Sequence, residues 1–97
     1  MSIKEQFEKF KEKYYEHVKP KIEEHNFIEA GNVMGNLILD FQGGEFRKIR
    51  EYDYGSNFIK CAKMFKDNLL RGEGDKGYVF MFEEGMNRLH KKVLRNS

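Results

Sequence analysis

The sequence predicts an all-α fold, a compact bundle of four or five short helices. Two observations carry this prediction: apolar residues recur at helical spacing, and glycine or a helix-capping residue closes most of these runs. A chain of 97 residues supports one hydrophobic core rather than two, so we expect a single domain over residues 1–97.

The first expected helix covers about residues 2–18. Ser2 stands three residues before Glu5, the spacing of a capping box at a helix start. Pro20 lacks a backbone N–H and disfavours helical geometry just before it, so we expect a kink or restart there and a further turn or two to about His25. The buried stripe is expected to consist of Ile3, Phe7, Phe10, Tyr14 and Val18.

The second expected helix covers about residues 27–42. It contains Gly31 and Gly35, and small residues four positions apart allow the backbone of a neighbour to approach closely. Each glycine also costs roughly 1 kcal/mol in helix propensity, so this helix needs tertiary support. Its apolar stripe is formed by Val33, Met34, Leu37, Ile38 and Phe41.

Residues 45–54 fit two structures. The spacing of Phe46, Ile49 and Tyr52 suits a short helix, whereas alternating apolar residues allow a β-hairpin at about 36–54 in a small α+β domain. We favour the helix, because the apolar spacing of the preceding segment is the cleaner signal. The α+β domain remains the alternative fold.

A further helix is expected at about 57–71, with Ser56 as its cap and Gly72 at its end. Cys61 lies beside its apolar stripe and is expected to be a half-buried, inert side chain rather than a nucleophile. The stripe consists of Phe58, Ala62, Phe65 and Leu69.

The final helix is expected at about 76–95, with Asp75 as its cap. Residues 78–82 are rich in residues that favour strands, so a strand there is the main rival. In the helical reading the buried stripe consists of Val79, Phe82, Met86, Leu89 and Val93.

Composition favours a globular cytoplasmic protein. Apolar residues make up 39% and charged residues 35%, which is too apolar for a disordered chain. Cys61 is the single cysteine, so an internal disulfide is impossible, and the first residues form no apolar signal segment. The apolar runs are far shorter than the roughly 20 residues of a membrane span, so we expect no membrane partner.

The sequence displays no catalytic or metal-binding constellation. His17 and His25 are eight residues apart with Pro20 between them, whereas helical metal ligands usually stand four apart. We expect the three histidines to be exposed, and we expect no enzyme activity, metal or cofactor.

An excess of large apolar side chains predicts a protein-binding surface. Residues 78–82 are all large and apolar, and a helix in a small domain buries only about half of its circumference. The preferred function is therefore a small non-enzymatic cytosolic protein that binds and modulates or inhibits a larger protein, with self-association as a variant. The candidate contact residues are Phe80, Met81, Tyr52 and Tyr54.

Segregated charge supports an alternative, a nucleic-acid-binding accessory or regulatory protein. Residues 56–72 carry a net charge of +3, residues 73–84 of −3 and residues 85–97 of +4. If the last two helices lie side by side, their basic faces can merge into one phosphate-binding surface. The candidate residues are Lys60, Lys63, Lys66, Arg88, Lys91, Lys92 and Arg95.

Overall fold

The structure, a computed structural model, describes residues 2–42, 49 and 55–95. The described residues form helices and no strand, which confirms the all-α prediction. In chain order the elements are α1 (Ile3–Lys13), the π-helix η1 (Tyr14–Val18), α2 (Lys19–Glu23), α3 (Phe27–Gln42), α5 (Gly55–Leu70) and α6 (Lys76–Arg95).

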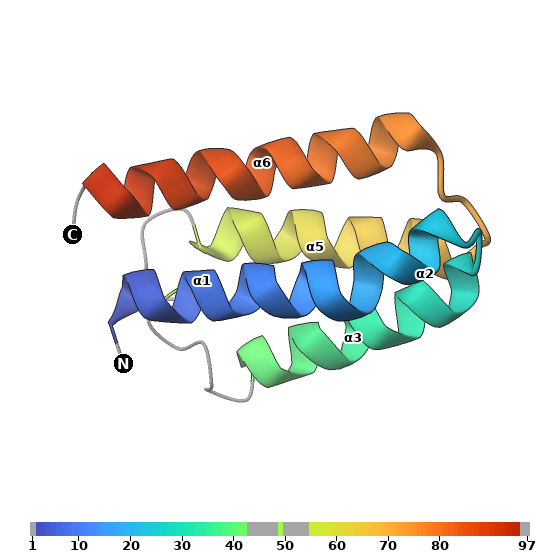
Figure 1. The fold of residues 1–97 in the computed structure, drawn as a ribbon, viewed down its shortest axis with the longest axis horizontal. Coiled ribbons are helices and arrows are strands. Elements are labelled where there is room, and N and C mark those ends of the chain that lie inside the picture. Colours follow the sequence, from blue (N-terminus) through green and yellow to red (C-terminus); the bar gives the residue numbers. More distant parts are fainter. Residues whose placement is uncertain (1, 43–48, 50–54, 96–97) are drawn as a thin grey trace.

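The long helices form an antiparallel bundle. Helix α6 packs against α1 and α5, while α3 packs against α5 on one side and against η1 and α2 on the other. The start of α1 and the end of α6 lie at the same end of the bundle, and the α2–α3 turn and the α5–α6 loop lie at the opposite end (Figure 1). Each long helix therefore runs against the direction of its neighbours.

The observed helices decide between the alternatives at two places. Helix α3 occupies the expected residues 27–42, so the proposed hairpin is wrong over 36–42. Helix α6 occupies the expected residues 76–95, so the rival strand at 78–82 is also wrong. In both segments the apolar stripe finds a neighbouring helix to pack on, and this outweighs local strand propensity.

The rest of the ambiguous segment lies outside the described residues. This applies to residues 43–48 and 50–54, and therefore to the candidate contact residues Tyr52 and Tyr54. Ile49 is described, and its side chain is buried in the core.

Ser2, Asp75 and Gly72 cap helices as the sequence predicts, whereas α5 begins at Gly55, so the expected cap Ser56 lies within that helix. The Ser2 hydroxyl accepts a hydrogen bond of 3.1 Å from the Glu5 N–H, and Asp75 Oδ1 accepts one of 3.0 Å from the Gly77 N–H. Gly72 has a φ of 79°, the left-handed conformation that glycine adopts without strain. Its N–H and the N–H of the next residue bond back to carbonyl groups of the last turn of α5, a Schellman motif.

Pro20 is accommodated by π-helical geometry. In η1 the backbone N–H of Lys19 donates to the carbonyl oxygen of Tyr14, five residues earlier. The proline has no N–H, and its ring crowds the carbonyl group four residues before it, so a wider turn relieves the clash. Helix α2 then begins at Lys19. The predicted restart near Pro20 is confirmed, but the end of the expected first helix is π-helical rather than α-helical.

Aromatic rings fill the centre of the bundle. The buried ring of Phe58 on α5 contacts rings from each of the other long helices. The distances between ring centroids are 5.7 Å to Phe7, 5.2 Å to Phe10, 6.5 Å to Phe41 and 5.9 Å to Phe82. The tilted and edge-to-face arrangements among these rings are favourable for aromatic pairs.

Helices α3 and α5 approach each other closely at Gly31. A β-carbon built at this glycine would lie 2.9 Å from the side chain of Leu70 and 3.1 Å from its backbone nitrogen. One built at Gly35 would meet Lys66 Cδ at 3.5 Å, an ordinary contact. The expected close approach along this glycine pair is therefore confirmed at Gly31, where α5 occupies the space of the missing side chain.

One histidine corrects the expectation that all three are exposed. His17 is exposed, but the ring of His90 stacks on Phe7 with 5.4 Å between centroids and is largely covered. Lys11 Nζ donates to His90 Nδ1 at 3.1 Å, and Nε2 lies 3.9 Å from a Glu8 carboxylate oxygen. Burial and the charge of Lys11 together lower the pKa of His90, because both disfavour the protonated ring.

We predict that the two glycines of α3 respond in opposite ways to alanine. Gly31→Ala places a methyl group against the Leu70 backbone and should cost roughly 1–3 kcal/mol of stability. Gly35→Ala has room for the methyl group and should gain roughly 0.5–1 kcal/mol, because alanine favours the helix. Urea denaturation of both variants measures the difference, and equal losses would contradict the close approach at Gly31.

We also predict that His90 makes the fold sensitive to acid. The pKa of His90 in the folded chain lies below its ordinary value of 6.5, so the unfolded chain binds the proton more readily. The stability that the neutral His90 ring contributes to the fold is fully present above pH 6.5. It is lost as the pH falls from there through the lowered pKa of the folded chain. Melting temperatures measured from about pH 7.5 to about pH 5 should fall more steeply for the native chain than for His90→Gln.

The matched control for this experiment is His17→Gln, which removes an exposed histidine from η1. This variant should keep the pH dependence of the native chain. Parallel curves for the native chain and His90→Gln would contradict the assigned role of His90.

Candidate functional site

A groove runs between α5 and α6. It consists of two adjoining hollows of about 220 and 230 Å³, which share Cys61, Met81 and Phe82. This α5–α6 groove has a floor of buried core side chains. Its walls are formed by Asn57, Cys61, Met64 and Asn68 of α5 and by Tyr78, Met81, Gly85, Arg88 and Lys92 of α6.

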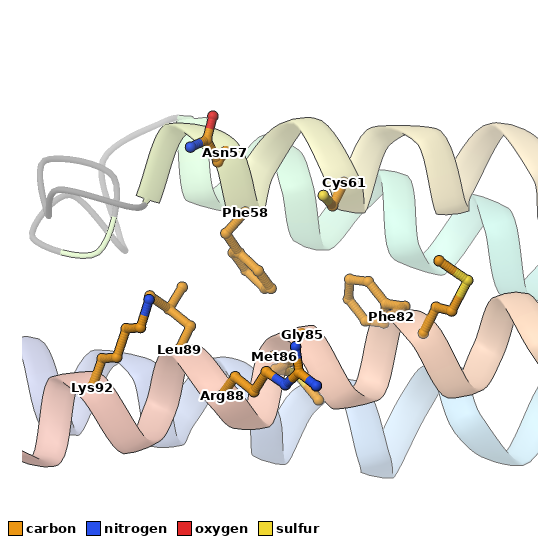
Figure 2. A pocket seen from close by; sticks show the side chains of 10 residues that line it. Asn57, Phe58, Cys61, Phe82, Gly85, Met86, Arg88, Leu89 and Lys92 are labelled. Atoms are coloured by element: carbon orange, nitrogen blue, oxygen red, sulfur yellow. The ribbon is translucent and has the colours of Figure 1, made fainter.

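Core rings hold the two walls in place. Phe58 on α5 and Phe82 on α6 point toward each other between the helices (Figure 2). Phe65 stacks on Phe82 with 4.6 Å between centroids and an angle of 14° between the ring planes. Because successive residues of a helix differ by about 100° in direction, burial of Phe82 turns its neighbour Met81 outward.

Large apolar side chains remain exposed on both walls. Met64 on α5 is 68% exposed, and on α6 Met81 is 70% and Tyr78 is 48% exposed. All three line the same hollow. Apolar side chains that gather at a concave surface mark an interaction site more often than apolar residues scattered singly.

Cys61 differs from its expected state. The sequence predicts a half-buried thiol beside the apolar stripe, but the structure leaves this cysteine exposed. The thiol lines both hollows of the groove, so it lies beside the α5–α6 contact rather than inside the core.

Gly85 forms a notch in the wall of the groove. A β-carbon built at this position meets nothing within 4 Å. Glycine inside a helix is about 1 kcal/mol less favourable than alanine, and no contact among the described residues requires its small size. The notch lies close to Cys61 and Arg88 in the same hollow.

The two ends of the groove differ in charge. Arg88 and Lys92 lie in one hollow, while Met64 and Tyr78 lie in the other. The Arg88 side chain is 75% exposed and pairs with Glu84 through an Nη2–Oε1 distance of 2.5 Å. The groove therefore has a cationic end and an apolar end.

The two expected contact residues that the structure describes, Phe80 and Met81, are not brought together. Met81 lines the α5–α6 groove, whereas Phe80, which is 65% exposed, lines a separate pocket toward α2. Consecutive helical residues point in different directions, so the two side chains belong to different surfaces. The role of Tyr52 and Tyr54 stays a prediction, because both lie outside the described residues.

The pocket at Phe80 is the larger hollow, with a volume of about 590 Å³. At its wall, Glu83 Oε2 accepts hydrogen bonds from the Tyr14 hydroxyl at 2.7 Å and from Lys19 Nζ at 2.5 Å. Burial and the nearby carboxylate raise the pKa of Tyr14, so this hydroxyl remains a donor. The pocket is lined by Lys19 and Lys76 and equally by Glu23 and Glu83, so it offers no dominant charge for recognising a ligand.

The basic residues of the alternative function occupy several surfaces. On α5, Lys60 and Lys63 are exposed, whereas Lys66 is half-buried near Gly35 of α3 and lies 3.1 Å from Asp67. The flank of α5 that faces α3 is not the flank that faces α6. Lys66 and the cations of the groove are therefore on different sides of α5.

On α6 the four candidate basic residues share one helix face, because Arg88, Lys91, Lys92 and Arg95 stand at i, i+3, i+4 and i+7. Lys91 and Arg95 are exposed, and Lys92 is half-buried at the groove. Helices α5 and α6 do lie side by side, but of the seven basic residues only Arg88 and Lys92 line the groove between them. Nucleic-acid binding by the seven basic residues stays a prediction.

Several groove residues were not singled out by the sequence. Met64 and Gly85 occupy the outer faces of regular helices, where a methionine or a glycine has no distinctive spacing. The one available signal is that Met64 and Met81 are large apolar residues outside the predicted stripes. That signal shows exposure but does not show that the two side chains share a hollow.

The described part of the chain contains no group of three histidine, cysteine, aspartate or glutamate residues arranged to hold a metal ion. Within the same residues, no helix has the length and apolar character needed to cross a membrane. No protein-family model, curated protein or solved structure matches this chain. The chemistry of the groove is therefore the basis for a functional proposal.

We predict that the outward residues of α6 contribute little to the stability of the monomer. Phe80→Ala and Met81→Ala should each change the free energy of unfolding by less than about 0.5 kcal/mol, because both side chains are exposed. Phe82→Ala, at the adjacent position, should cost roughly 3–5 kcal/mol because it removes a buried ring. Thermal and urea denaturation of the three variants give the comparison, and a large loss for Met81→Ala would place that residue in the core.

Proposed function

We propose that this is a small cytoplasmic protein that binds a larger protein through the α5–α6 groove and thereby modulates or inhibits it. Binding is proposed to act by occupying a surface of the partner, without catalysis. The observation that carries the proposal is the pair of exposed methionines, Met64 and Met81, in one hollow of the groove.

The energetics of burial support a protein partner. Covering one methionine side chain contributes roughly 1.5–3 kcal/mol, and the groove offers two methionines with Tyr78 beside them. Methionine is flexible and polarisable, so it adapts to the shape of an apolar partner. Tyrosine contributes an apolar ring with a polar hydroxyl, which suits the border of an interface.

Polar groups around the groove support specific binding. Asn57 and Asn68 supply amide donors and acceptors on α5, and Arg88 and Lys92 supply cations on α6. An apolar centre with polar groups at its rim is the usual anatomy of a protein interface. Burial of Met81 between such groups would make it an energetic centre of the contact.

Nucleic-acid binding is the second candidate function. It is favoured by the exposure of Lys60, Lys63, Lys91 and Arg95 on the last two helices. Phosphate contacts need cations and leave apolar side chains uncovered, so this function does not account for Met64 and Met81. We therefore place it second.

We predict that Met81→Lys abolishes capture of the partner from extract of the native cells. The added charge would have to be buried without a partner group, so retention should fall by about tenfold or more. Capture should persist after nuclease treatment. The experiment uses the full chain as bait and quantifies the retained protein by mass spectrometry.

Leu39→Lys is the matched control, because Leu39 is also a largely exposed apolar residue but belongs to α3. It should retain the partner as well as the native chain does. Capture that survives Met81→Lys, disappears with nuclease and is lost when Lys60, Lys63, Lys91 and Lys92 are changed to Glu would favour nucleic-acid binding instead.

A further inference from the structure

We propose that the partner segment in the α5–α6 groove is an amphipathic helix with carboxylates at its N-terminal end, seated over Arg88 and Lys92. This inference rests on the proposed function and specifies the chemistry of the partner. It draws on the notch at Gly85, the distribution of charge and the direction of α6.

The notch at Gly85 fits the close approach of a helix. This chain already uses glycine in that way, because α5 reaches Gly31 of α3 so closely that a β-carbon there would meet Leu70 at 2.9 Å. At Gly85 the equivalent space is open. A helix that lies in a groove between two others packs its side chains between theirs, and a glycine at the crossing lets the backbones come nearer.

The charge of the groove selects an acidic occupant. Arg88 and Lys92 line the groove, and no acidic residue is among the described residues that line its two hollows. Arg88 has five N–H donors, so it can keep its ion pair with Glu84 and still bind a second carboxylate. The apolar end at Met64 and Met81 then covers the apolar face of the same helix.

The direction of α6 orients the occupant. The cations lie toward the C-terminal end of α6, where the helix dipole is negative, and acidic residues are most favourable near the N-terminus of a helix. An occupant whose N-terminal end lies over Arg88 therefore runs antiparallel to α6. Its acidic turn precedes apolar residues spaced at i, i+3, i+4 and i+7.

Two other occupants fit less well. A second copy placed groove to groove would bring its own cations either against Arg88 and Lys92, where like charges repel, or over Met64 and Met81, where they would face apolar side chains. A nucleic acid would satisfy the cations but would leave Met64 and Met81 uncovered. The observations therefore favour an acidic helix of a protein partner.

The test uses a display library of peptides of about 18 residues, long enough to form helices. Their apolar positions are fixed as leucine or methionine, and their remaining positions are randomised among aspartate, glutamate, lysine, arginine and serine. Selection on the full-length native chain, with removal of peptides that also bind Met81→Lys, should enrich aspartate and glutamate over lysine and arginine by about tenfold in the N-terminal half.

The best selected peptide is then synthesised with a fluorescent label, and its affinity is measured by anisotropy. Arg88→Glu combined with Lys92→Glu should weaken binding by about tenfold or more, and a peptide with lysine in place of its acidic residues should bind this variant better than the native chain. Gly85→Ala should raise the melting temperature but weaken binding by about tenfold. Gly35→Ala, the matched control on α3, should raise the melting temperature and leave binding unchanged.

The outcomes separate this inference from the proposed function. Selected peptides with no acidic preference, or affinities unchanged by Gly85→Ala, would overturn the acidic helix even where Met81→Lys still loses the partner from extract. Capture of the partner from extract that Met81→Lys leaves intact would overturn the proposed function itself. Concentration-dependent dimerisation that is lost in Met81→Lys would assign the groove to a second copy of the chain. Binding of a labelled RNA or DNA duplex that Met81→Lys leaves intact would assign the cations to a nucleic acid.

Discussion

The bundle depends on the burial of one ring, that of Phe58. It is the point at which rings from α1, α3 and α6 meet α5, with centroid distances between 5.2 and 6.5 Å. Phe58 is only 7% exposed, and most rings around it are fully covered. A domain of this size has a single core, so the helix faces that surround this ring also determine which faces remain outside. The position of the groove is thus a consequence of how the core is filled.

The same packing explains why the groove is apolar. Helices α5 and α6 meet through Phe65 and Phe82, whose rings stack at 4.6 Å, and the side chains just outside this contact form the groove walls. Two of those side chains, Met64 and Met81, are largely exposed, and Gly85, on the same helix as Met81, has no side chain that could add cover. A monomer gains nothing from this arrangement, because exposed methionines are not buried and an interior glycine weakens a helix. A partner helix would gain from both.

Glycine illustrates how one residue type serves opposite purposes in this fold. Leu70 of α5 occupies the space beside Gly31, whereas the space beside Gly85 is open, although both glycines lie inside regular helices. Pro20 is a similar case, because its missing N–H predicts a local disturbance but leaves open whether the chain kinks or forms the π-helix Tyr14–Val18. The chemistry of a residue limits which local conformations and contacts are possible. The packing of the neighbouring helix determines which of them the folded chain adopts.

The sequence by itself determined the class of the fold and most helix limits. Residues 27–42 and 76–95 are helical as predicted, and Ser2 and Asp75 act as expected at helix starts, because propensity and capping depend on a few adjacent residues. Sequence periodicity also indicated that Phe80 and Met81 face outward, but it did not show that they belong to different surfaces. Only the tertiary structure decided that separation, along with the burial of His90 and the exposure of Cys61. The physical reason is that the helix repeat fixes the directions of side chains relative to one another on a single helix. The packing of whole helices around the core then decides which of those side chains a neighbouring helix covers.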